Sequence, residues 1–276
     1  MYKKGLVVLL GGCMLVSLVA CSKTTTQGDN SATEQEVVSD TATEAENISA
    51  EEETVSADAQ EEPNAQEQEE VSDQIALIKE NKDTWNRADS EGEQYNYTVS
   101  DLDHDGYLEI TTASMQGTGL YTYFTIYEVN EDKTGLVEQS YDAEEGESLP
   151  DIIETTVDTY TMADGTVNYA YTDILRAGPA DSYEIIGYLT LGDGKLTITP
   201  VATKYEMFET EEESTTTYAD AEDKEITEDD YNAAMKNTFT GATKGTQKFL
   251  WISEEDWNDD ITDQLTSAYE TFTGNN

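Results

Sequence analysis

The stretch LYTYFTIYEV, residues 120–129, decides the fold class of this 276-residue chain. Its side chains alternate between two rows. One row holds Leu120, Thr122, Phe124 and Ile126, and the other holds Tyr121, Tyr123, Thr125 and Tyr127. A period of two is typical of a β-strand, and aromatic and β-branched residues suit a pleated surface. The stretch therefore predicts a strand with two partly buried faces.

Similar runs continue on the C-terminal side and are separated by turn signals. Ala163-Asp164-Gly165 and Gly192-Asp193-Gly194 each lie between two alternating segments. An Asp-Gly pair in that position is a strong short-range signal for a β-hairpin. We therefore expect an antiparallel meander, with strands at residues 155–162, 166–176, 182–191 and 195–208.

Helical patterns lie at the two ends of the same region. A first helix is expected at residues 73–87, where Ile75, Ile78 and Trp85 recur at near-helical spacing. A second begins at Thr227 with three acids in its first turn, and a last one begins at Ser253. A short strand is expected at residues 247–252, and an exposed acidic loop near residues 209–224. The prediction is an α+β domain at 71–276: an antiparallel β meander sheet with helices at its N- and C-terminal ends.

One segment carries the ingredients of a metal site. The sequence DLDHDGYLE, residues 101–109, places carboxylates at loop positions 1, 3, 5 and 9 and a glycine at position 6. Four acids so close together repel each other unless a cation lies between them. Calcium accepts six to eight oxygen ligands in irregular arrangements, and Gly106 permits a sharp turn. The predicted ligands of a structural calcium ion are Asp101, Asp103, Asp105, Glu109 and the main-chain carbonyl of Tyr107.

The loop departs from an EF-hand at position 12, where Thr112 replaces the bidentate glutamate. Strand-like alternation on both sides indicates a loop between strands. Its Asp-x-Asp-x-Asp-Gly core resembles the calcium loops of integrin-type propeller repeats and of dockerins. The alternative is a solvated acidic turn in an acidic chain. His104 is interpreted as a solvent-facing loop residue rather than a group that transfers protons.

The N-terminus has the order of an export signal. Lys3 and Lys4 precede a 16-residue apolar stretch, Gly5–Ala20, which is short for a membrane span of about 20 residues. The stretch ends in Leu-Val-Ala-Cys at residues 18–21 and resembles the lipobox of bacterial lipoproteins. That resemblance implies that residues 1–20 are removed and that Cys21 carries a diacylglycerol. The alternative is an ordinary secretory signal with an incidental cysteine.

An acidic segment, residues 21–70 including the predicted lipidated cysteine, joins this signal to the domain. From Ser22 to Glu70 it holds 15 acidic residues, one lysine and no aromatic residue. Such a composition cannot bury enough apolar surface to offset the entropy of ordering the chain. We expect a disordered tether.

Composition excludes several classes of protein. The formal net charge is -46, which repels nucleic acids, and no glycine-rich loop points to a nucleotide. With His104 the only histidine, and Cys13 and Cys21 the only cysteines, no catalytic residue and no cofactor-binding residue other than the metal ligands is assigned. Tyrosines could form a platform for carbohydrate or the cover between sheet and helices, and we favour the cover. The candidates are Tyr121, Tyr123, Tyr127, Tyr169 and Tyr171.

The combination of motifs resembles a set of uncharacterised surface lipoproteins of low-GC Gram-positive bacteria. The shared pattern is a lipobox, an acidic tether, a tryptophan in a short helix, a tyrosine-rich strand, a single acidic calcium-type loop and a late helix. Here these are residues 18–21, 22–70, Trp85, Tyr97, 101–110 and 226–231. The resemblance implies anchoring on the extracytoplasmic face of the membrane and a bound metal, but no activity.

These observations favour a lipid-anchored extracytoplasmic binding or interaction module over an enzyme. Its partners would be the membrane, through the lipid, and a cell-wall or surface glycan or a protein. The alternative is a cell-surface hydrolase that acts on glycan or peptide through carboxylates. A concave pocket with two convergent carboxylates would favour the hydrolase.

Overall fold

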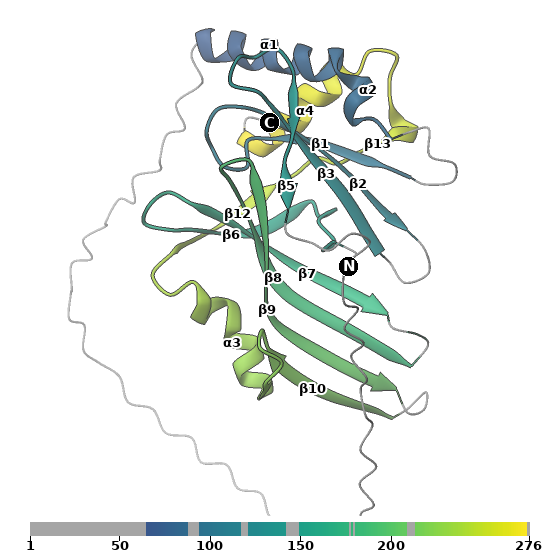
Figure 1. The fold of residues 1–276 in the computed structure, drawn as a ribbon, viewed down its shortest axis with the longest axis vertical. Coiled ribbons are helices and arrows are strands. Elements are labelled where there is room, and N and C mark those ends of the chain that lie inside the picture. Colours follow the sequence, from purple (N-terminus) through teal and green to yellow (C-terminus); the bar gives the residue numbers. More distant parts are fainter. Residues whose placement is uncertain are drawn as a thin grey trace, which may run out of the picture. The chain divides into compact units, whose positions relative to one another are not determined.

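Two β-sheets and four α-helices form the described part of the chain, and the α+β prediction is confirmed. The computed structural model describes residues 65–87, 94–116, 121–141, 149–176, 178, 180–208 and 213–274 (Figure 1). All of these belong to one unit of the chain, Gln60–Asn276. The predicted signal, Cys21 and the tether up to residue 64 lie outside the described residues.

The first sheet has five strands in the order β13-β1-β2-β3-β4, all antiparallel. Their bounds are β1 Asn96–Ser100, β2 Glu109–Gln116, β3 Tyr121–Val129, β4 Leu136–Glu138 and β13 Ile252–Ser253. The register pairs Thr98 with Thr111 and Ser100 with Glu109, so these side chains share one face of the sheet. Tyr97 and Ile110 belong to the opposite face.

The second sheet has eight strands in the order β11-β10-β9-β8-β7-β6-β12 with a short parallel partner, β5, on β9. Their bounds are β5 Ser140–Tyr141, β6 Thr156–Thr161, β7 Val167–Arg176, β8 Asp181–Gly192, β9 Lys195–Phe208, β10 Ser214–Asp220, β11 Glu225–Ile226 and β12 Thr243–Lys248. The central strands form the predicted meander. At the predicted hairpin 192–194, Asp193 and Gly194 have φ angles of 52° and 72°, as a tight two-residue turn requires.

Three helices cover one face of the five-stranded sheet: α1 (Ala65–Glu80), α2 (Lys82–Trp85) and α4 (Thr262–Thr273) (Figure 1). The core between them centres on Trp85, which is fully buried and packs edge-on against Tyr97 with ring centroids 5.2 Å apart. The indole N–H donates to the carbonyl of Ile78 over 2.8 Å, which satisfies its only polar atom.

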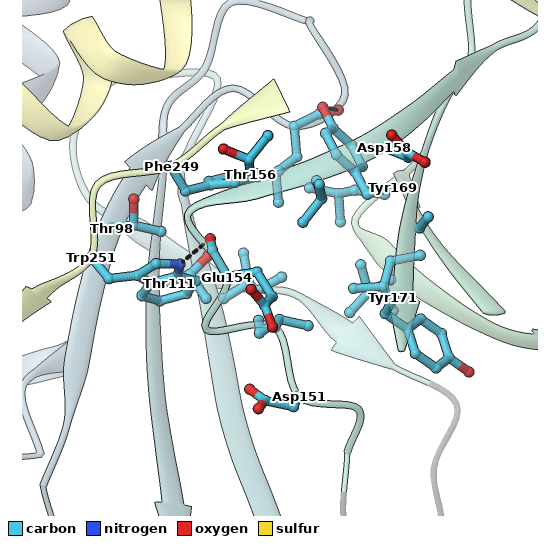
Figure 2. Close-up of a pocket in the computed structure, with 18 of the residues that line it drawn as sticks. Thr98, Thr111, Asp151, Glu154, Thr156, Asp158, Tyr169, Tyr171, Phe249 and Trp251 are labelled. Carbon is cyan, nitrogen blue, oxygen red and sulfur yellow. Dashed lines mark hydrogen bonds between the residues drawn. The ribbon is translucent and has the colours of Figure 1, made fainter. Parts of the chain in front are cut away.

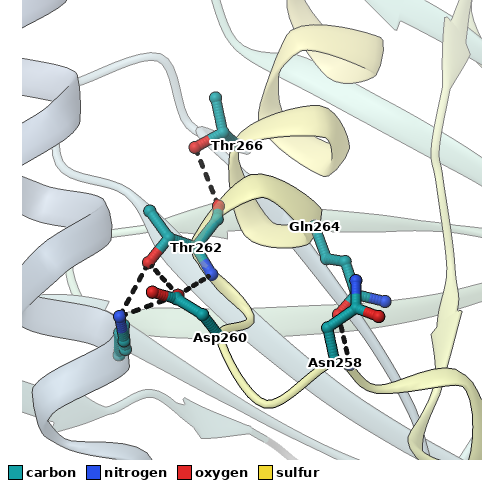
Figure 3. A network of polar contacts seen from close by, with 6 residues as sticks. Asn258, Asp260, Thr262, Gln264 and Thr266 are labelled. Carbon is teal, nitrogen blue, oxygen red and sulfur yellow. Dashed lines mark hydrogen bonds and ion pairs between the residues drawn. The ribbon is translucent and has the colours of Figure 1, made fainter.

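A polar network joins the two ends of the domain (Figure 3). Lys79 of α1 donates to the carboxylate of Asp260 over 2.8 Å and to the hydroxyl of Thr262 over 2.9 Å. Asp260 also accepts the backbone N–H of Thr262, the first residue of α4, over 2.9 Å. One carboxylate thus accepts the first N–H of α4 and ties this helix to α1.

The opposite face of the five-stranded sheet packs against the second sheet. Ala113, Phe124 and Ile126 form a second core there with Tyr169, Leu189 and other residues of the second sheet. Helix α3 (Glu228–Thr238) packs on the far face of the second sheet, where Phe239 stacks on Tyr160 with centroids 4.3 Å apart. The layers therefore run helices, first sheet, second sheet, helix.

Four sequence predictions need correction. The strand expected at residues 247–252 is not one strand, because β12 ends at Lys248 and β13 begins only at Ile252. The first helix is two helices, α1 and α2, and α1 begins at Ala65, so it takes in residues 65–70 that the sequence analysis assigns to the tether. The acidic loop predicted near 209–224 contains strand β10, because its run of threonines pairs along the edge of β9. Ser253 caps a single 3-10 turn, η1 (Glu254–Asp256), and the last helix starts only at Thr262.

Helix α3 follows its prediction closely. Thr227 accepts the N–H of Asp230 and the Asp230 side chain accepts the N–H of Thr227, which completes a capping box. Of the helices described here, none is long and apolar enough to span a membrane.

Candidate metal centre and the cavity beside it

Three carboxylates converge where the loop 101–109 connects β1 to β2. Asp101, Asp103 and Glu109 each offer an oxygen atom, and these atoms lie within 4.8 Å of one another. Asp101 follows the last residue of β1 directly, and Glu109 is the first residue of β2. The sheet register therefore fixes the two ends of the group.

The loop between them turns back sharply. His104 and Gly106 both have a positive φ, 60° and 89°. The N–H of Gly106 points to the carboxylate of Asp101 over 3.4 Å. The sharp turn at Gly106 agrees with the sequence prediction, because glycine adopts this conformation without steric cost.

Helix α1 holds the loop from outside through one side chain. Gln74 is 2% exposed, donates to the carbonyl of Gly106 over 2.9 Å and accepts the N–H of Leu108 over 2.9 Å. The sequence analysis missed this residue. Gln74 lies four residues before Ile78 on the buried side of the helix, and a glutamine there was the available signal.

Glu109 is the most unusual group of the site. Its side chain is fully buried, and its Oε2 accepts the N–H of Leu102 over 2.8 Å and the hydroxyl of Ser100 over 3.2 Å. Its Oε1 has no hydrogen-bond partner among the described residues, and neither has Oδ1 of Asp103. Burial, and then the charges of Asp101 and Asp103, raise the pKa of Glu109 well above its usual value.

Other carboxylates add to the negative field. Glu128 of β3 lies directly across the sheet from Glu109. Partial burial and the charges of Asp105, Asp103 and Asp101 raise the pKa of Glu128 to about 7. Burial also raises the pKa of Asp103, with Asp105 adding to the effect. Positive charge would stabilise this group, because Glu109 is fully buried and Asp101 and Asp103 are partly buried.

The predicted ligands divide into two groups. Asp101, Asp103 and Glu109 are brought together. Asp105 lies outside that group: its side chain is exposed and accepts the N–H of Tyr107 over 2.8 Å. The role of the Tyr107 carbonyl stays a prediction. His104 is exposed, as expected, and its ring stacks on Phe272 of α4 with centroids 6.0 Å apart.

A cavity of about 320 Å³ lies between the two sheets, next to this site (Figure 2). Thr98 and Thr111 line it from the first sheet. They are the next pair of residues on the same face as Ser100 and Glu109, two positions away along β1 and β2. The rest of the wall is mainly aliphatic and aromatic. It includes Leu102, Val157, Tyr169, Tyr171, Leu189, Phe249 and Trp251.

Leu102 belongs to both the loop and the cavity. Its N–H donates to Glu109 over 2.8 Å, and its carbonyl accepts the hydroxyl of Tyr169 over 2.8 Å. Its side chain lines the cavity. The carboxylate cluster and the cavity are therefore joined through one residue.

The predicted cluster of tyrosines is mostly internal. Tyr127, Tyr169 and Tyr171 are buried, whereas Tyr123 is 38% exposed. The side chain of Tyr121 lies outside the described residues. Tyr127 packs beneath the helices, and the other two buried tyrosines line the cavity. These three tyrosines therefore pack in the interior of the domain and do not form an exposed platform for carbohydrate.

Comparison of the chain with protein-family models, with curated proteins and with solved structures finds no match. The argument on function therefore depends on the site alone.

Proposed function

We propose that this chain is a lipid-anchored extracytoplasmic binding module whose domain is stabilised by a calcium ion at Asp101, Asp103 and Glu109. The observation that carries the metal is the carboxylate of Glu109. It is fully buried, one of its oxygens has no hydrogen-bond partner among the described residues, and it belongs to a group of three carboxylates whose ligand oxygens lie within 4.8 Å of one another. An unpaired buried charge is costly, and a bound cation removes that cost.

The donor set favours calcium over other metals. The three converging groups are all carboxylates, which are hard oxygen ligands, and no histidine or cysteine belongs to the group. Zinc and copper sites use nitrogen and sulfur. Magnesium needs near-octahedral geometry and keeps several waters, whereas calcium accepts an irregular loop.

The ion would supply positive charge and rigidity rather than chemistry. It would neutralise the carboxylates of the loop, which α1 already holds through Gln74. The same loop contributes Leu102 to the cavity wall. A structural ion here would stabilise the junction between α1, the first sheet and the cavity.

Binding is favoured over hydrolysis because two of the carboxylates that line the cavity already have partners within the protein. Of the three that line it, Asp158 forms an ion pair with Lys244 at 2.8 Å, and Asp151 accepts the N–H of Ile153 over 3.0 Å. A glycosidase needs two convergent carboxyl groups that are free to act as acid and as nucleophile or base.

Thermal unfolding of the full chain in calcium and in chelator tests the metal. Calcium at about one hundred times its Kd adds about 2.7 kcal/mol, which corresponds to a rise in Tm of roughly 5–10 °C for a domain of this size. Asp103→Asn should lose most of this rise. Asp132→Asn, an exposed acid outside the group, should keep it. A chain whose Tm ignores calcium would disprove the metal.

Export and lipidation depend on Lys3, Lys4 and the sequence around Cys21. Metabolic labelling with a fatty-acid analogue tests them, and Cys21→Ala should abolish the label. Equal labelling of the two chains would remove the anchor from the proposal and leave the metal site untouched.

A further inference from the structure

The wall of the cavity between the sheets carries two hydroxyl groups that lack a hydrogen-bond partner among the described residues. Thr98 and Thr111, paired across β1 and β2, are each 2% exposed. Neither hydroxyl has a hydrogen-bond partner within the described part of the chain. Two neighbouring buried hydroxyls without partners are rare in a folded protein, and both line the same cavity (Figure 2).

The wall of the cavity also carries acidic residues, and one of them reaches the surface. Asp151, Glu154 and Asp158 line the cavity, and Glu154 is exposed. None of the described lining residues is Lys, Arg or His. Lys244 neutralises Asp158 from outside, which leaves the carboxylates of Asp151 and Glu154 to attract a cation. The net charge of -46 strengthens that attraction at long range.

Most of the remaining wall is apolar and partly aromatic. Leu189, Leu191 and Leu196 line it on the second sheet, and Phe249 and Trp251 line it beside the first. The indole N–H of Trp251 is already used, because it donates to the carbonyl of Glu154 over 3.0 Å. That bond fixes the ring next to the acidic residue. The volume of about 320 Å³ lies at the low end of the range of roughly 300–1,000 Å³ for ligand sites.

We infer that this cavity binds a small amphipathic amine. The protonated amino group would lie at Glu154 and Asp151, an apolar body would lie against the leucine and aromatic side chains, and a hydroxyl group would meet Thr98 and Thr111. The inference rests on the proposed role of the domain as a binding module and names the class of its ligand. A neutral sugar fits less well, because the wall is mainly aliphatic.

Three probes of nearly the same shape test each part of the inference by titration calorimetry on the full chain. Tyramine carries both the amine and the distal hydroxyl, 2-phenylethylamine lacks the hydroxyl, and tyrosol replaces the amine with a neutral alcohol. A charge-assisted contact at a partly exposed mouth is worth about 1.4 kcal/mol, so tyrosol should bind about tenfold more weakly than tyramine. Equal binding of tyramine and tyrosol would overturn the inference.

Two substitutions locate the probe. Glu154→Gln should weaken tyramine about tenfold and leave tyrosol unchanged, whereas Glu222→Gln removes the same charge from an exposed turn outside the cavity and should change neither. Thr111→Val keeps the shape of the side chain. It should reduce tyramine to the affinity of 2-phenylethylamine without affecting 2-phenylethylamine itself. Tyramine binding that ignores both Glu154→Gln and Thr111→Val would place the probe elsewhere and overturn the inference.

The same titrations separate this inference from the metal. Calcium-dependent stabilisation without tyramine binding would overturn the cavity ligand and leave the calcium site standing. Tyramine binding to a chain whose Tm does not respond to calcium would overturn the calcium site and support the cavity ligand.

Discussion

The two sheets differ in how deeply their strands are enclosed. β1 has five residues, four of them buried, and lies between the helices and the second sheet. β9 has 14 residues, of which only two are buried. One carboxylate oxygen of Glu109 and the hydroxyls of Thr98 and Thr111, which lack hydrogen-bond partners among the described residues, all belong to the enclosed sheet. Buried polar groups that need a partner thus gather in the sheet that is covered on both faces, and the longer sheet supplies the other wall of the cavity.

The largest effect is expected from Trp85→Ala. This side chain is fully buried in the core under the helices. Its loss should lower the free energy of unfolding by about 3–5 kcal/mol. Phe208→Ala on the second sheet, where the side chain is 43% exposed, should change it by about 0.5 kcal/mol or less. Urea unfolding measures both, and similar losses would break the contrast between the sheets.

The second largest effect is expected from Glu109→Gln. This substitution should lower the stability of the chain in calcium but not in chelator. In chelator the variant should be at least as stable as the native chain, because a neutral amide replaces a buried carboxyl group whose charged form is disfavoured by burial and by Asp101 and Asp103. In calcium it should lose most of the stabilisation of about 2.7 kcal/mol expected at one hundred times Kd. The check is Tm in both buffers. A variant less stable than the native chain in chelator would contradict the interpretation of this carboxylate.

Gly187→Ala sharpens the comparison from the second sheet. A Cβ at this position would lie 2.5 Å from the carbonyl oxygen of Thr199 and from the ring of Tyr171, at a shift in register between β8 and β9. The cost should be about 1–3 kcal/mol by urea unfolding, with the calcium-dependent rise unchanged. Gly192→Ala, where the added carbon meets nothing within 4 Å, is the matched control. Equal stability of the two variants would contradict this, because it would mean that β9 and Tyr171 move away from the added carbon at no cost.

The smallest effect concerns Asp260 and depends on pH. Hydrogen bonds from Lys79 and Thr262 lower the pKa of this carboxyl. A group whose pKa is lower in the folded chain stabilises it above the pKa of the unfolded chain, and that contribution fades as the pH falls. Asp260→Asn should therefore lower Tm slightly at pH 6, and the difference should shrink towards pH 2. Asp259→Asn, its exposed neighbour, should show no such trend.

Local patterns predicted most of the strands and the metal loop, because alternation and ligand spacing are properties of adjacent residues. Asp101, Asp103 and Glu109 came together because a single turn connects them. The division into two sheets was not predictable in the same way. It depends on pairings between distant segments, such as Tyr97 with Ile252 and Val157 with Gln247. Gln74 and the cavity were missed for the same reason.

The backbone of Leu102 has a thermodynamic consequence. Its N–H donates to the carboxylate of Glu109, and its carbonyl accepts the hydroxyl of Tyr169, which lines the cavity. If an ion tightens this residue and thereby favours an occupant of the cavity, the occupant must strengthen the ion by the same factor. The protein would then release its occupant where calcium is scarce and retain it where calcium is abundant.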